Sequence, residues 1–253
     1  MKTEVMGIVN VTPDSFSDGG RYFSAEEAVK RALNMAAEGA GIIDIGGEST
    51  RPGSVPVEWA EEWRRIEPVL LALRERKRNF KISVDTYHPE TAERAVACGA
   101  SIINCVYAKT LPQMTEIISA RGEAELVMPA DAWSEDIHAG LRGRIYIDPM
   151  IGFGTTREDD IRLLASIARL SRTARVLVGA SRKRIVKKLT GEKVTGKNLG
   201  GNLGIAVWCA LQGASVVRVH DVRETVQALK VIAALEQETE RAFGAASGKG
   251  AND

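Results

Sequence analysis

The chain has 253 residues, of which 44% are hydrophobic and 26% charged, and its formal net charge is +1. This composition supplies enough apolar side chains for a large core, and the length fits one α/β barrel or two smaller domains. A net charge this close to zero argues against nucleic acid or another polyanion as a partner, so any anion site must be a local cluster of basic residues.

The cysteines and the apolar stretches indicate in which cellular compartment the protein is found. The three cysteines are scattered without C-x-x-C spacing, which predicts reduced thiols; they are Cys98, Cys105 and Cys209. The apolar part of the N-terminal segment MKTEVMGIVN is too short for a signal peptide. The longest apolar region, 203–219, is interrupted by polar residues and too short to span a membrane. We therefore expect a cytoplasmic protein without membrane contact.

Short apolar segments rich in β-branched residues alternate along the chain with longer segments of helical periodicity. Strands are predicted at 4–9, 42–45, 81–84, 101–104, 124–128, 144–147, 175–178 and 215–219. These segments are apolar on both faces, as buried parallel strands are. Eight strand–helix units in a chain of this length favour a TIM (β/α)8 barrel over a doubly wound sheet.

The intervening helices carry recognisable start signals. A capping box at 24–27 opens a helix that runs to about Glu38, and Pro89 suits the first turn of another. Further helices are predicted at 58–76, 159–170, 199–211 and 223–241.

The fifth helix unit is expected to be atypically short. Residues 129–143 leave room for only a short helix, at about 135–141, although a crossover connection normally needs more. No linker separates two domains, so we expect a single domain over 1–243 and a frayed polar tail over 244–253.

Polar residues follow the apolar strands, where the parallel strands of a barrel place active sites. Asp85 and Asp148 come directly after apolar runs; they could cap a helix and form a turn, or point into the barrel mouth. Two buried carboxylates there would need donor partners. A flat heterocycle with amino and ring N–H groups would suit them, and Asn104 could add a donor and an acceptor. The chain therefore reads as an enzyme.

Basic residues gather after strands seven and eight, the common phosphate region of this fold. Arg218 and His220 alternate with valines, so they share one side of a buried strand, and Lys183 follows strand seven. The charges at 184–188 are expected to face solvent, and Asp221 to cap the last helix.

Two long loops follow strands one and two. Residues 10–20 exceed what a βα turn needs and could close over a ligand to exclude water. Residues 46–53 offer glycines, hydroxyls and Arg51, which could neutralise a phosphate, whereas Glu48 could equally be a surface charge.

Several motifs carry a resemblance to a known family. NVTPDSFSDGG, GGESTRPG, SVDTY, IIN, DPMIGFG, SRKR and RVHDV occur in this order, and the chain resembles dihydropteroate synthases over nearly its whole length. The resemblance implies a TIM barrel, commonly a homodimer, that joins 6-hydroxymethyl-7,8-dihydropterin diphosphate to para-aminobenzoate. It also implies Mg²⁺, with diphosphate leaving first and the arylamine attacking the pterin cation.

The resemblance assigns roles to individual residues. Asn10 would hold Mg²⁺ against the diphosphate, and Met128 would pack against the pterin ring. The expected catalytic residues are Lys183, Arg218 and His220. The expected substrate-binding set is Thr50, Arg51, Asp85, Asn104, Met128, Asp148, Phe153, Lys183, Arg218 and His220.

The chain also departs from the family pattern. Besides the short fifth unit, unusual residues stand at four positions, Cys105, Pro129, Met150 and Thr155. They leave open a pterin-binding paralogue with altered or no catalysis. A methyltransferase that uses methyltetrahydrofolate is a further alternative, but the intact diphosphate set argues against it.

Overall fold

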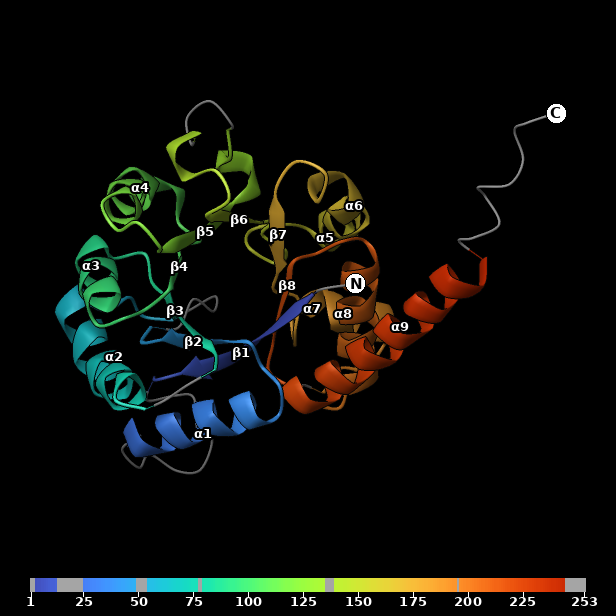
Figure 1. Ribbon diagram of the computed structural model, residues 1–253, viewed down its shortest axis with the longest axis horizontal. Coiled ribbons are helices and arrows are strands. Elements are labelled where there is room, and N and C mark those ends of the chain that lie inside the picture. The colour runs from blue at the N-terminus through green and yellow to red at the C-terminus, as the bar shows by residue number, and fades with distance from the viewer. Residues whose placement is uncertain are drawn as a thin grey trace.

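The structure is a computed structural model that describes residues 3–12, 25–48, 54–76, 79–134, 139–194 and 196–243. Eight parallel strands close into a barrel in the order β1 to β8, with helices around them (Figure 1). The strands are β1 (Glu4–Asn10), β2 (Ile42–Gly46), β3 (Lys81–Asp85), β4 (Ile102–Asn104), β5 (Glu125–Pro129), β6 (Ile145–Asp148), β7 (Arg175–Val178) and β8 (Val216–Val219). The TIM barrel and all eight predicted strands are confirmed.

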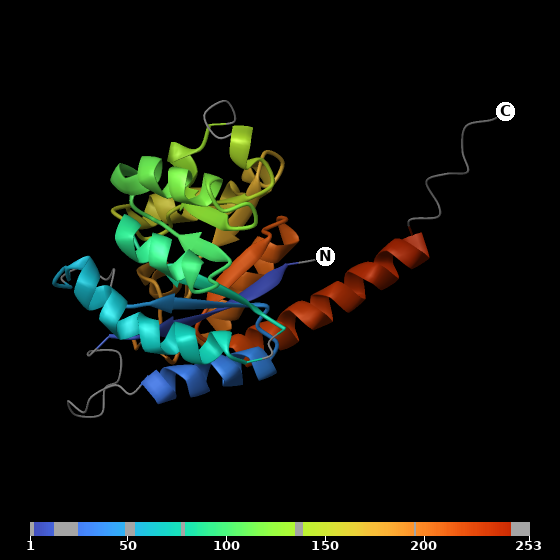
Figure 2. The same ribbon diagram turned by 60° about the vertical axis from the view of Figure 1, so that its left-hand side comes forward.

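The outer helices are α1 (Ala25–Ala37), α2 (Trp59–Arg74), α3 (Pro89–Ala97), α4 (Leu111–Ser119), α5 (Arg157–Ala165), α6 (Ile167–Leu170), α7 (Arg184–Thr190), α8 (Leu199–Leu211) and α9 (Val222–Phe243). The prediction missed α4 and α7. The C-terminal part of α9 projects beyond the barrel in both views (Figures 1 and 2). None of the described helices has the length and apolar content needed to cross a membrane.

The prediction of a single helix at 159–170 is wrong in two respects. The helix starts earlier, because Thr156 and Asp159 form a capping box at the start of α5. It is also divided into α5 and α6 at Ser166, whose hydroxyl donates to the carbonyl of Leu163 (2.8 Å). A hydroxyl bonded to its own backbone competes with the regular helix.

The fifth unit is short, as predicted. Between β5 and β6 the described residues form two 3-10 turns, η3 (Ala130–Ala132) and η4 (Ala139–Leu141), and the rest of the helix predicted at 135–141 lies outside them. Arg144 donates through Nη1 to the carbonyls of Ile118, Arg121 and Ala124 (2.9, 2.9 and 3.3 Å). This arginine ties the end of α4 to β6.

Two apolar layers fix which residues face the barrel interior. The inner layer comprises Met6, Ile42, Ile102, Val127, Tyr146, Leu177 and Val216, and a larger outer layer packs between strands and helices. Because strand side chains alternate, the residues two positions beyond the inner layer also face inward. These are Ile8, Asp44, Asn104, Pro129, Asp148, Gly179 and Arg218.

Candidate active site

A charged cluster centred on Arg218 fills the mouth of the barrel. Arg218 Nε donates to Asp44 Oδ2 and Nη2 donates to Asp85 Oδ2, each at 2.6 Å. Asn104 Nδ2 donates to the same oxygen of Asp44 (3.2 Å). The ends of β2, β3, β4 and β8 therefore meet in one polar site, as the prediction for Asp85, Asn104 and Arg218 requires.

Burial controls the ionisation of the two predicted carboxylates. It raises the pKa of Asp85 to about 7, although the guanidinium of Arg218 acts in the opposite direction. Burial also raises the pKa of Asp148, against the effect of Lys183. Perturbed carboxyl groups in a polar barrel mouth are typical of functional sites.

Asp44 is a site residue that was not predicted from the sequence. Asp44 is 0% exposed, and its Oδ1 has no hydrogen-bond partner among the described residues. The available signal was an ionisable residue in the middle of the apolar run GIIDIGG, because a buried charge requires a partner. Asp44 joins Arg218 to Asn104, so it couples two predicted binding residues.

Lys183 lies between β7 and α7, where it is the residue before the first turn of α7. Its Nζ donates to the carbonyl of Ile151 (2.5 Å) and lies 4.1 Å from the ring centroid of Phe153. Burial lowers the pKa of Lys183 to about 8, partly offset by the carboxylate of Asp148. The loops after β6 and β7 thus bring Phe153, Asp148 and Lys183 together, as predicted.

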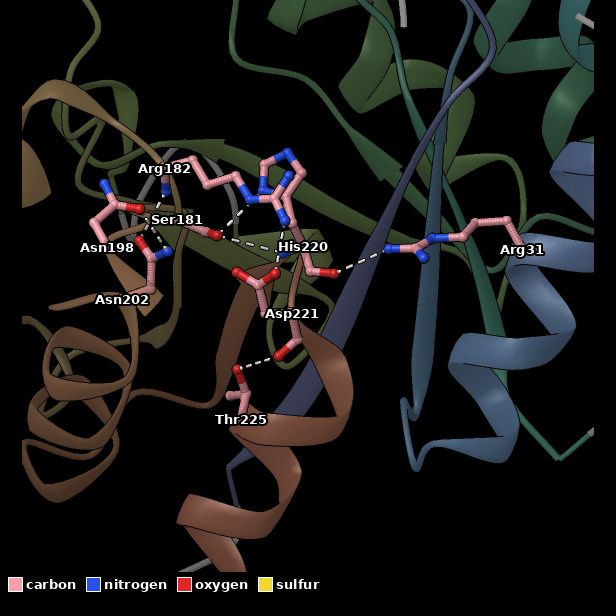
Figure 3. Close-up of polar contacts among 8 residues, drawn as sticks. All are labelled: Arg31, Ser181, Arg182, Asn198, Asn202, His220, Asp221 and Thr225. Atoms are coloured by element: carbon pink, nitrogen blue, oxygen red, sulfur yellow. Dashed lines mark hydrogen bonds and ion pairs between the residues drawn. The ribbon is translucent and has the colours of Figure 1, made fainter. Parts of the chain in front are cut away.

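His220 is anchored where β8 ends (Figure 3). Its Nδ1 lies 3.1 Å from Ser181 Oγ, which also accepts from the His220 backbone N–H (3.3 Å). Arg31 of α1 donates to the carbonyl of His220 (3.2 Å). These contacts hold the ring and the backbone of a residue predicted to bind diphosphate.

Asp221, predicted to cap the last helix, precedes α9 and forms an ion pair. Its carboxylate pairs with Arg182 Nη2 at 2.6 Å, while its backbone carbonyl accepts from the hydroxyl of Thr225 (2.7 Å), as Figure 3 shows. Arg182 has a left-handed φ of 60°, and its N–H donates to Asn202 Oδ1 (2.9 Å). The ion pair and the amide contact together hold this strained backbone.

Met128, predicted to pack against the pterin ring, lies on the helix side of β5. Met128 is 0% exposed and belongs to the outer layer, whereas its neighbour Val127 faces the barrel interior. Pro129 is the inward residue at the end of β5 and pairs in register with Asp148. Met128 therefore packs toward the helices in this structure.

Cys105 also faces away from the mouth. Its thiol lies 3.6 Å from both the carbonyl of Tyr107 and Thr110 Oγ1, within the outer layer. Burial raises the pKa of this thiol. The unusual residue at position 105 therefore affects the packing of the loop after β4 and not the side chains that face the barrel interior.

Asn10 is the predicted residue for Mg²⁺. It ends β1 at the barrel mouth, and a Cβ on Gly46 would lie 3.7 Å from its Oδ1. An amide oxygen suits Mg²⁺, which commonly takes few protein ligands and several oxygens of substrate or water. Thr50, Arg51 and most of the loop over 10–20 lie outside the described residues. Among those described, no group of three or more His, Cys, Asp or Glu could hold a metal.

Comparisons with known proteins agree with this geometry. Residues 6–140 and 134–220 match the family of pterin-binding enzymes. The chain is 37% identical over 257 residues to a dihydropteroate synthase of Escherichia coli (strain K12), covering 91% of this chain and 90% of the relative. It is 37% identical over 263 residues to the enzyme of Staphylococcus haemolyticus, covering 95% and 98%.

Solved structures give the same result. Dihydropteroate synthase of Xanthomonas albilineans with 4-aminobenzoic acid superposes with a TM-score of 0.83 at 40% identity, covering 93% of each chain. A complex of that enzyme with 7,8-dihydropteroate gives 0.81 at 38% identity, covering 93% of this chain and 94% of the other. The predicted resemblance is confirmed. The chain belongs to the dihydropteroate synthases, a family of pterin-binding transferases.

Proposed function

We propose that this enzyme joins 6-hydroxymethyl-7,8-dihydropterin diphosphate to para-aminobenzoate, giving 7,8-dihydropteroate and diphosphate. Family membership supports the reaction, and the Xanthomonas albilineans enzyme has been solved with 4-aminobenzoic acid and with 7,8-dihydropteroate. The observation in this chain that carries the proposal is the meeting of Asp85, Asn104 and Arg218 in one buried cluster.

The pterin ring is assigned to Asp85, Asn104, Asp148 and Lys183. Carboxylates accept hydrogen bonds from ring N–H and amino groups, and an ammonium donates to ring oxygen or nitrogen. Asn104 Oδ1 has no hydrogen-bond partner among the described residues, so it can accept from the heterocycle without breaking a contact. Phe153, beside Lys183 Nζ, adds an apolar surface for the ring.

The diphosphate is assigned to Arg218 and His220, together with Thr50 and Arg51. Negative charge develops on the diphosphate as the C–O bond to the pterin methylene breaks. Fixed cationic groups stabilise that charge, and they are effective because they are already oriented. A bound Mg²⁺, held by Asn10 and substrate oxygens, would neutralise further charge. The amine of para-aminobenzoate then forms the C–N bond and loses a proton.

The direct test is formation of dihydropteroate from the two substrates with Mg²⁺, with binding of the pterin diphosphate measured in parallel. Turnover supports the proposed reaction. Tight binding without turnover would instead support a pterin-binding paralogue, which the residues Cys105 and Pro129 and the short fifth unit favour. Absence of pterin binding would contradict both.

We also infer a homodimer in the cytoplasm. Exposed apolar side chains lie on the last three helices and are candidates for a subunit interface: Leu189, Trp208, Leu211, Val231 and Leu235. All three cysteines are free thiols, which fits a reducing compartment.

A further inference from the structure

The loop that follows β6, residues 149–155, has an unusual backbone. Met150 has a φ of 64°, and Gly152 and Gly154 have φ of 77° and 70°. A left-handed conformation is costly for a residue with a side chain, so surrounding contacts must hold Met150 in place. The loop also packs tightly against Lys183, because a Cβ on Gly152 would lie 3.0 Å from Lys183 Cδ.

Asp160 in the first turn of α5 anchors this loop. The residue is 1% exposed, and its Oδ1 accepts from the Gly152 N–H (2.7 Å) and from Thr155 Oγ1 (2.6 Å). Thr155 Oγ1 also accepts from the Gly152 N–H (3.0 Å). Among the described residues, this buried carboxylate is thus held by an amide and a hydroxyl, without a basic side chain at ion-pair distance. Such a group is costly to bury, which points to a specific use.

The Ile151–Gly152 peptide unit links Asp160 to the candidate active site. Its N–H donates to Asp160, and its carbonyl accepts from Lys183 Nζ (2.5 Å). A peptide unit is planar and trans, so fixing the N–H direction also fixes the direction of the carbonyl. Hydrogen bonds in series also polarise one another, which strengthens the carbonyl as an acceptor for the ammonium.

We propose that Asp160, with Thr155, is a positioning residue for the pterin site: it fixes the Ile151–Gly152 peptide and thereby holds Lys183 Nζ where the heterocycle binds. The inference rests on the proposed function, because it assigns the pterin to Lys183. It also gives a role to Thr155, one of the positions where the chain departs from its family.

The charge of Asp160 supports this arrangement. Burial lowers the pKa of Lys183, and the carboxylates of Asp148, Asp160 and Asp85 oppose that effect, while Arg218 reinforces it. Removing the charge of Asp160 should therefore lower the pKa of Lys183 further.

The test measures the affinity of purified full-length variants for 6-hydroxymethylpterin by calorimetry as a function of pH. Asp160→Ala should weaken binding about tenfold at neutral pH, the factor expected from a misplaced lysine contact. Asp160→Asn retains an acceptor for the Gly152 N–H but no charge. It should bind almost normally at neutral pH. As the pH is raised, its affinity should begin to fall at a lower pH than the affinity of the wild type. Glu158→Ala, which removes an exposed acidic side chain from the same turn of α5, is the matched control.

Lys183→Ala separates failure of this inference from failure of the proposed function. If Lys183→Ala loses affinity while both Asp160 variants bind like the wild type at every pH, the positioning role is wrong and the pterin site stands. If Lys183→Ala also binds normally, the pterin assignment itself is wrong. If circular dichroism shows that Asp160→Ala does not fold, the test rests on Asp160→Asn. The inference is then overturned if the affinity of this variant falls at the same alkaline pH as the affinity of the wild type.

Discussion

Arg218 is the residue that links the two halves of the candidate site. It is assigned to the diphosphate, yet the two ion pairs that it forms among the described residues are with carboxylates, Asp44 and Asp85. The pKa of Arg218 reflects this setting: burial lowers it, but the two carboxylates outweigh burial and leave it above its ordinary value. The guanidinium therefore stays charged at neutral pH.

Replacing Arg218 should affect the diphosphate more than the pterin. Arg218→Ala should weaken binding of the pterin diphosphate well beyond its effect on bare 6-hydroxymethylpterin, because only the former carries the anion. It should also lower the free energy of unfolding by about 3 kcal/mol, since Asp44 loses its cation in a buried site. Calorimetry with both ligands and chemical denaturation measure these effects, with the exposed Arg184→Ala as control. Equal losses for the two ligands would show that Arg218 does not bind the diphosphate.

Pterin affinity should depend on pH through Asp85 and Lys183. The raised pKa of Asp85, about 7, means that lowering the pH below that value protonates the acceptor. The lowered pKa of Lys183, about 8, means that raising the pH above that value removes the ammonium. Affinity should therefore be highest between these two values and fall on both sides. Asp85→Asn should bind more weakly, and its affinity should no longer fall at low pH, whereas the fall at high pH should remain. If the affinity of this variant still falls at low pH, Asp85 is not the group responsible.

At the scale of elements, the fifth unit shows how the barrel tolerates a short crossover. No α-helix is described between β5 and β6, but Leu141 of η4 is buried and belongs to the outer layer. Arg144 donates to three carbonyls between the end of α4 and β5, and two of them, those of Ile118 and Arg121, also accept a backbone N–H. Local contacts thus replace part of the packing that a full helix would provide.

Arg144→Ala should destabilise this region. Loss of charged hydrogen bonds to three carbonyls should reduce the free energy of unfolding by about 2 kcal/mol. Arg121→Ala, an exposed arginine in the adjacent segment, should change it by less than about 0.5 kcal/mol. Urea denaturation of the two variants provides the comparison, and equal stabilities would mean that Arg144 does not support the short unit.

At the scale of the whole molecule, exposed apolar side chains on the last helices are candidates for a subunit interface. Leu235 of α9 and Leu211 of α8 are exposed, and the C-terminal part of α9 projects beyond the barrel (Figures 1 and 2). We expect a dimer at micromolar concentration by sedimentation. Leu235→Glu should yield folded monomers because a charge would be buried in the interface, whereas Leu71→Glu on α2 should leave the dimer intact. A monomeric wild type would contradict the proposal.

Much of this architecture follows from the sequence alone. Buried parallel strands are apolar on both faces, and turn and cap residues separate them from helices, so all eight strands could be located. The polar residues at their ends indicated the active face, because parallel strands of a barrel share that edge. The single domain over 1–243 and the tail over 244–253 remain predictions.

Other features depended on the tertiary structure. A shift of one residue along a strand reverses the face of a side chain, so only the closed barrel shows that Met128 faces the helices. Arg218 meets Asp44 across 174 positions of the chain, and no local pattern encodes that pairing. Asp160 reaches Lys183 through a peptide unit whose orientation depends on the folded loop. The sequence by itself determined the strands and the side of the barrel that carries the chemistry, because both depend on local periodicity. The folded chain decided which side chains meet there, because those contacts depend on register and closure.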